Sequence, residues 1–199
     1  NVSLYNETNG AAIPPTPTVG GVGLIADYAR RADFGSMKPG DVLVLVGATK
    51  SELGASMYLR EIAGREDGAP PPVDLALERK TGDVVRGLIQ AGQLHTVHDL
   101  SDGGLAAALC EMCLASNIGC DLRLEGVPWV TLFAEDQARY LVALNDPTPV
   151  LTACRAAGVP AAILGEAGGE AIRIEAALDL PLAELRKAHE GWMPAFMGD

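Results

Sequence analysis

Positive charge is scarce in this sequence and does not gather in any segment. The 199 residues include 15 Lys and Arg against 26 Asp and Glu, which gives a net charge of −11. A nucleic-acid or anionic-membrane partner requires a basic face, so we predict neither partner. An anionic substrate would have to be bound by backbone amides, helix N-termini or a metal ion.

Long apolar runs and several common motifs are also missing. No apolar run approaches the ~20 residues that span a bilayer, and no signal peptide is visible. The GxSxG motif of esterases, the lysine motif of the P-loop and a GxGxxG after a strand are all absent from the sequence, which excludes the usual forms of those sites.

Cysteine is limited to four residues, two of which form the motif "CEMC" at Cys110 and Cys113. This spacing is found in metal and redox sites, but the sequence has no second CxxC and no neighbouring His. The surrounding "GLAAALCEMCLAS" instead has the pattern of a buried helix. We therefore predict reduced core cysteines and a cytoplasmic protein, with a metal or redox site as the alternative.

What the sequence does contain predicts an α+β, layered fold. Hydrophobic residues make up 48% of the chain, enough for the core of one domain, or of one domain and a piece of another. Because predicted strands often follow one another through short links, a mixed or antiparallel sheet packed with helices is expected. Strands are predicted at 23–29, 41–49, 94–99, 120–125, 138–145, 161–167 and 171–176, the last two as a hairpin. Helices are predicted at 51–64, 73–92, 105–116, 148–158 with Thr148 as its cap, and 179–192.

The strongest candidate site is "HDLSDGG", in which a strand delivers Asp99 and Ser101 to a pair of glycines at the start of a helix. Glycines allow backbone N–H groups to approach phosphate oxygens, and a helix N-terminus adds positive charge. A neighbouring carboxylate is a suitable Mg²⁺ ligand. The alternative is that Ser101 or Asp102 only caps the helix.

Two further stretches are weaker candidates. In "NVSLYN", alternation places Asn1 and Ser3 on one face of a strand, where they suit a Mg²⁺ or phosphate site or, equally, a solvated strand end. "AEDQ" places Glu135, Asp136 and Gln137 in a turn before a strand, and such turns are usually only turns. His95 and His98 lack a third metal-binding neighbour, which favours a structural role.

Together these stretches resemble the phosphoribosylformylglycinamidine synthase II family, the synthetase of the fourth step of purine biosynthesis. "NVSLYNET", "IPPTPTVGGVG", "SELGASMYL", "HDLSDGGLAAALCEM" and "MPAFMGD" occur in the family's order. The resemblance implies the fold of the aminoimidazole ribonucleotide synthetase-like superfamily, in a protein built from duplicated halves. Residues 1–23 would end the second N-type domain, and 24–199 would form the second C-type domain.

The resemblance also implies an activity, which is that of an ATP-dependent carbon–nitrogen ligase. The family converts formylglycinamide ribonucleotide, ATP and ammonia to formylglycinamidine ribonucleotide, ADP and phosphate. Its partners are a glutaminase subunit, which supplies the ammonia, and a small assembly subunit.

By the same resemblance, ATP and Mg²⁺ are the expected cofactors, and the residue roles carry over position by position. Asn1 would bind the metal and Ser3 the substrate, whereas Asp99 and Ser101 would bind metal and nucleotide at an auxiliary second site. No catalytic residue is expected in this chain, which alone should be inactive. The alternatives are a non-catalytic nucleotide-binding scaffold and a small-molecule kinase of the same superfamily.

Overall fold

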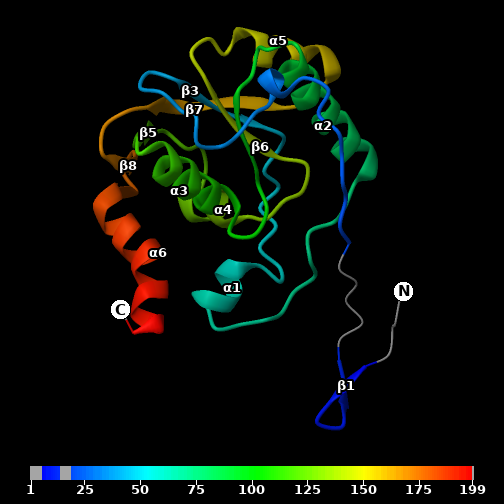
Figure 1. Ribbon diagram of the computed structural model, residues 1–199, viewed down its shortest axis with the longest axis vertical. Helices are drawn as coiled ribbons and strands as arrows, with labels where there is room; N and C mark the ends of the chain where they lie inside the picture. Colours follow the sequence, from blue (N-terminus) through cyan, green and yellow to red (C-terminus); the bar gives the residue numbers. More distant parts are fainter. Residues whose placement is uncertain (1–5, 14–18, 199) are drawn as a thin grey trace.

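The computed structural model describes residues 6–13 and 19–198. The short strands β1 (Glu7–Thr8) and β2 (Ala11–Ala12) pair antiparallel and are exposed. They lie apart from the main body of the molecule, which is built around one large sheet (Figure 1). Within the described residues, no helix combines the length and apolarity needed to cross a membrane.

The described part of the main body contains a seven-stranded mixed sheet in the order β4-β6-β3-β7-β5-β8-β9. All neighbouring strands run antiparallel except β5 and β8, which are parallel. The strands are β3 (Val42–Val46), β4 (Thr96–Asp99), β5 (Cys120–Leu122), β6 (Tyr140–Leu144), β7 (Ala161–Ala167), β8 (Ala171–Ile174) and β9 (Leu178–Pro181). The arrangement confirms the predicted α+β class with a mixed sheet.

Helices cover both faces of the sheet, as Figure 1 shows. One layer consists of α2 (Leu75–Gln90) and α5 (Thr148–Ala157), and the other of α3 (Gly104–Ser116), α4 (Pro128–Phe133) and the first turns of α6 (Leu182–Met197). The short helices α1 (Met57–Glu61) and η1 (Tyr28–Arg30) lie outside these layers.

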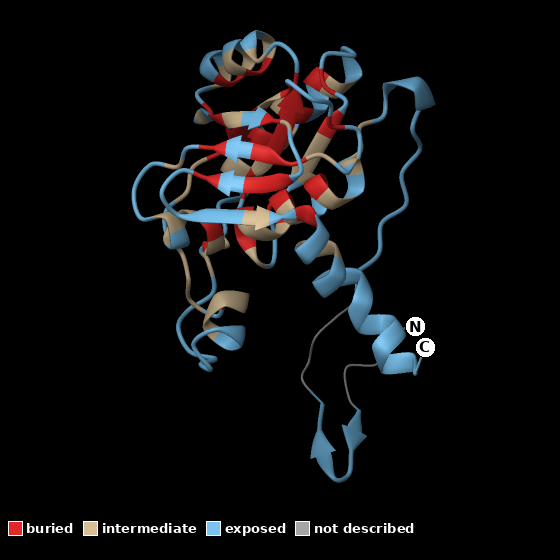
Figure 2. Cartoon of the chain, turned by 90° about the vertical axis from the view of Figure 1, so that its left-hand side faces the viewer, coloured by how far each residue is buried: buried red, intermediate tan, exposed pale blue. Residues whose placement is uncertain are grey.

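The central strand β3 is buried on both faces because it stands between the two helix layers. Leu43 and Leu45 pack with α3, whereas Val44 and Val46 pack with α2 and α5. A strand buried on both sides needs a continuous apolar sequence rather than an alternating one, which is what "VLVLV" supplies. Figure 2 shows the buried residues gathered in the sheet and in the helix faces against it, with the outer turns of α6 exposed.

The predicted hairpin of 161–167 with 171–176 is wrong, because β5 lies between the two strands. Cys120 of β5 is opposite Ala167 of β7 and also opposite Ile172 of β8. The link passes over the start of β5, where Gly119 donates to the carbonyl of Gly169 at 2.9 Å. A Cβ at Gly119 would lie 2.2 Å from the carbonyl oxygen of Ala171, so only glycine allows this close crossing.

Several element boundaries also differ from the sequence prediction. Residues 23–29 form no strand but run exposed into η1, since no neighbouring strand pairs with them. The helix predicted at 51–64 is confined to α1 and is capped by Ser56. Thr148 begins α5 instead of capping it, and the carboxylate of Asp146 accepts its N–H at 3.0 Å. The sequence prediction missed α4 and β9.

The cysteines of "CEMC" belong to the core of α3. Cys113 is buried, and its sulfur lies 3.8 Å from that of Cys120, both thiols being free. Burial raises the pKa of Cys110 to about 11. Among the described residues, no group of three or more His, Cys, Asp and Glu is arranged to hold a metal ion.

This packing predicts that the thiols of α3 resist alkylation in the folded protein. With a pKa of about 11, about one Cys110 thiol in a thousand is ionised at pH 8, and the thiolate is the reactive form. Iodoacetamide labelling followed by peptide mass spectrometry should show slow modification of Cys110, rising about tenfold per pH unit, and none of Cys113 before unfolding. Rapid, complete labelling of both residues at pH 8 would contradict this packing.

Candidate functional site

Three segments meet at one end of the sheet. Because β6 runs antiparallel to both β3 and β4, the last residues of β3 and β4 lie beside the first residue of β6. Val46 and Asp99 are both opposite Tyr140 in register. The segments 47–57, 99–104 and 134–139 therefore leave the sheet at the same edge.

Glu135 connects these three segments. Its Oε1 accepts the N–H of Gly103 at 2.8 Å and the N–H of Met57 at 2.9 Å. Its own N–H donates to the carbonyl of Glu52 at 3.0 Å. Gly103 precedes α3 and Met57 begins α1, so one carboxylate serves the N-terminal ends of two helices, where negative charge is stabilising.

Arg139 fixes the backbone that carries Glu135. Only 2% of Arg139 is exposed, and its guanidinium donates to the carbonyl of Asp136 at 2.9 Å, that of Ala134 at 2.6 Å and the hydroxyl of Thr49 at 3.0 Å. Burial lowers the pKa of Arg139, and the carboxylates of Asp136 and Glu135 oppose that shift. Hydrogen bonds from Arg139 therefore fix the conformation of the segment 134–139.

Asp136 extends the same network to the loop after β3. It is 3% exposed, and its Oδ2 accepts the N–H of Lys50 at 2.9 Å. The other oxygen, Oδ1, is buried without a hydrogen-bond partner among the described residues. A buried carboxylate of this kind depends on the neighbouring guanidinium for its compensating charge.

Two glycines allow the backbones of these segments to touch. Gly104 has φ of +61°, and a Cβ there would lie 2.3 Å from the carbonyl oxygen of Ala134. Gly47 has φ of +100°, and a Cβ there would lie 2.5 Å from the carbonyl oxygen of Ala138. Both positions therefore require glycine for conformation and for space.

Asp99 and Ser101 lie exposed on the loop that this network holds. The side chain of Asp99 is 70% exposed, with its carboxylate 3.6 Å from Nδ1 of His98. His98 also contacts the carboxylate of Glu111 and the ring of Phe34, in keeping with the structural role favoured for it. Asn1 and Ser3 lie outside the described residues.

The glycines of the loop differ from the sequence expectation. Neither Ser101 nor Asp102 caps α3, since Gly103 occupies that position without a side-chain cap. The N–H of Gly103 is taken by Glu135 and that of Gly104 by the carbonyl of Ser101, at 3.0 Å. These two amides are therefore not free for a phosphate, and a ligand would meet the side chains of Asp99 and Ser101.

A magnesium ion fits this loop only in part. Mg²⁺ takes about six oxygen ligands, and the exposed side chains of the loop offer the carboxylates of Asp99 and Asp102 and the hydroxyl of Ser101. Their chemistry suits a hard cation, and the remaining oxygens would have to come from ATP, water or other parts of the protein.

Sequence reasoning underrated the segment 134–139. The composition of "AEDQ" predicts only a turn for Glu135, Asp136 and Gln137, and the local pattern predicts no role for Arg139. The available signal was an arginine directly before the buried strand β6, since a charged residue in such a place must have partners nearby. Gln137 is exposed.

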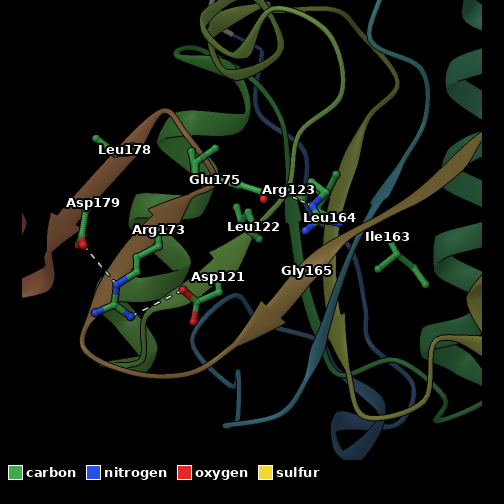
Figure 3. A pocket seen from close by; sticks show the side chains of 11 residues that line it. Asp121, Leu122, Arg123, Ile163, Leu164, Gly165, Arg173, Glu175, Leu178 and Asp179 are labelled. Carbon is green, nitrogen blue, oxygen red and sulfur yellow. Dashed lines mark hydrogen bonds and ion pairs between the residues drawn. The ribbon is translucent and has the colours of Figure 1, made fainter.

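Apart from the loop 99–104, a hollow of about 610 Å³ lies over β7, β5, β8 and β9, on the side of the sheet where α2 and α5 pack farther along (Figure 3). Arg173 of β8 stands between Asp121 at 3.7 Å and Asp179 at 3.4 Å, and Arg123 pairs with Glu175. Each arginine is neutralised by a neighbouring carboxylate, as on a solvated sheet surface. Because its arginines are already paired, we do not interpret this hollow as an anion-binding site.

Comparison with known proteins supports the resemblance seen in the sequence. Phosphoribosylformylglycinamidine synthase subunit PurL from Caulobacter vibrioides is 61% identical over 199 residues, covering 99% of this chain and 27% of its own length. The protein of the same name from Rhodopseudomonas palustris strain TIE-1 is 50% identical over 203 residues, covering 100% and 28%. The chain thus spans about a quarter of the length of these curated relatives, and the resemblance to their family is confirmed.

The fold comparison agrees. The structure of T. maritima PurL complexed with FGAR superposes with a TM-score of 0.67 at 21% identity, covering 79% of this chain and 30% of that one. A family model described as "AIR synthase related protein, C-terminal domain" matches residues 38–176. That range includes every strand of the large sheet except β9, together with the loop 99–104 and the segment 134–139, and the chain belongs to this family.

Proposed function

We propose that this chain is part of an ATP-dependent carbon–nitrogen ligase of purine biosynthesis. The whole protein would convert formylglycinamide ribonucleotide, ATP and ammonia to formylglycinamidine ribonucleotide, ADP and phosphate. The observation that carries the proposal is the 61% identity with a synthase subunit along nearly the whole chain.

The chemistry of this conversion is an activation followed by a displacement. The amide oxygen of the substrate attacks the γ-phosphorus of ATP, ADP leaves, and the amide becomes an iminophosphate. Ammonia then adds to that carbon, and the carbon–oxygen bond breaks to release phosphate. Bound Mg²⁺ neutralises phosphate charge, and most of the protein's work is positioning.

Within that protein this chain supplies binding groups rather than a catalytic residue. Asp99 and Ser101 are proposed to contact nucleotide and metal at an auxiliary site, with Asn1 as a metal ligand and Ser3 as a substrate contact of the main site. Residues 1–23 would complete an N-type domain, and 24–199 would form the C-type domain. The exposure of Asp99 beside a tethered loop supports its part in this arrangement.

The proposed partners are a glutaminase subunit, as the source of ammonia, and a small assembly subunit, in the cytoplasm. Support comes from a solved structure of PurLQS from Thermotoga maritima, whose PurL chain shares this fold. The net charge of −11 argues against a nucleic-acid partner.

A second candidate is a non-catalytic scaffold that binds nucleotide only for stability. The supporting observation is that the N–H of Gly103 already donates to the carboxylate of Glu135, so this amide is not available to a phosphate. The two candidates are compatible at different levels, because an auxiliary site within the ligase would itself bind nucleotide without taking part in turnover.

Asp99→Asn in the full-length protein tests the auxiliary role. The substitution removes the charge that would bind Mg²⁺, so the rise in melting temperature produced by ADP–Mg²⁺ should fall, while kcat stays within about twofold of wild type. Thermal shift and steady-state assays measure the two effects, and Glu184→Gln on exposed α6 is the matched control. A drop in kcat of a hundredfold would place the loop in the chemistry and contradict the auxiliary role.

The isolated chain 1–199 is expected to bind ADP–Mg²⁺ weakly, with Kd above about 100 µM. Its loop 99–104 offers the exposed carboxylates of Asp99 and Asp102 and the hydroxyl of Ser101, and the other ligands would come from the rest of the protein. Isothermal titration calorimetry checks this, with circular dichroism to establish folding. Micromolar binding by the folded chain would show that the site is complete without further domains.

A further inference from the structure

We propose that Glu135 is a positioning residue that holds the loop 99–104 in place for nucleotide binding, through its two backbone hydrogen bonds. This inference rests on the proposed function, in which Asp99 and Ser101 contact the nucleotide. It assigns Glu135 a positioning task within the chain rather than contact with a ligand.

The loop is held at both ends by the same segment. At its start, the N–H of Leu100 donates to the carbonyl of Arg139 at 3.0 Å. At its end, the N–H of Gly103 donates to the carboxylate of Glu135 at 2.8 Å. Asp99 and Ser101 lie exposed beside and between these two tethers, so their positions follow from the segment 135–139.

The backbone on both sides of Glu135 in the sequence is also held by hydrogen bonds. The preceding carbonyl, of Ala134, accepts from the guanidinium of Arg139 at 2.6 Å, and the following side chain, of Asp136, accepts the N–H of Lys50 at 2.9 Å. The Glu135 side chain therefore extends from a backbone that cannot shift without breaking buried hydrogen bonds of Arg139 and Asp136.

Gly104 limits the ways in which the loop can sit. Its Cα lies so close to Ala134 that a Cβ would be 2.3 Å from that carbonyl oxygen. The loop thus packs directly against the backbone of Ala134, and the Glu135 carboxylate adds its hydrogen bond to the N–H of Gly103. Without the carboxylate, the N–H groups of Gly103 and Met57 would both lose an ionised acceptor, the stronger class of hydrogen bond.

The two roles of Glu135 make opposite predictions for glutamine. A glutamine retains an oxygen that accepts both N–H bonds but has no charge, whereas a ligand contact to Mg²⁺ or to substrate requires the carboxylate. Alanine removes both. The pair Glu135→Gln and Glu135→Ala therefore separates positioning from ligand contact.

The experiment uses the full-length protein with ADP–Mg²⁺ as the probe. In Glu135→Ala, hydrogen exchange at the Gly103 and Met57 amides should quicken at least about tenfold and ADP–Mg²⁺ affinity should fall about tenfold. In Glu135→Gln, exchange should stay slow and affinity should stay within about threefold of wild type. Glu184→Ala on α6 is the control, and thermal unfolding reports whether each variant is folded.

Two outcomes would overturn the positioning role. Glutamine as damaging to affinity as alanine, with both amides still protected, would make the carboxylate a ligand. Unchanged affinity in Glu135→Ala, together with lost affinity in Asp99→Asn, would leave the loop in place without Glu135. If neither Asp99→Asn nor Glu135→Ala changed affinity, the nucleotide role of the loop itself would be refuted.

Discussion

This end of the molecule depends on the hydrogen bonds that two side chains make to the backbone. They are the carboxylate of Glu135 and the guanidinium of Arg139. Glu135 accepts N–H groups at the N-terminal ends of α1 and α3, and Arg139 holds the two carbonyls on either side of it. Since Arg139 is buried, removing either group would leave charge or backbone donors uncompensated in the interior. The three segments at this end of the sheet are therefore joined to one another by hydrogen bonds of these two side chains and of the backbone between them.

The sheet behind this unit gives it a fixed base. β3, β6 and β4 deliver Gly47, Tyr140 and Asp99 to the same edge, and helices on both faces bury β3 and β6. Their side chains alternate between two separate cores, so a change of register would exchange one core for the other. The loop that carries Asp99 thus follows the edge strand β4, which is paired along its length with the buried strand β6.

Local pattern in the sequence predicted much of this, and long-range contact explains the remainder. The strand "VLVLV" and the helices at 105–116 and 148–158 follow from local apolar composition, run length and flanking turn residues. The order of β5 between β7 and β8 does not, because it depends on a backbone crossing at Gly119 between residues far apart in sequence. The motif "HDLSDGG" correctly predicts a strand, a loop and a helix, but the phosphate-binding use that it predicts for the glycine amides is wrong for Gly103 and Gly104. Gly104 serves contact with Ala134 rather than contact with phosphate, and nothing local in the sequence distinguishes these uses.

The central claim is that Glu135 and Asp99 act through one loop, and a double-mutant cycle tests it most directly. ADP–Mg²⁺ affinity would be measured for the full-length protein with Asp99→Asn, Glu135→Ala and both substitutions. If Glu135 only positions the loop for Asp99, the second substitution should cost little once Asp99 is lost, so the double variant should bind about as weakly as the weaker single variant. Losses that multiply independently would contradict the account.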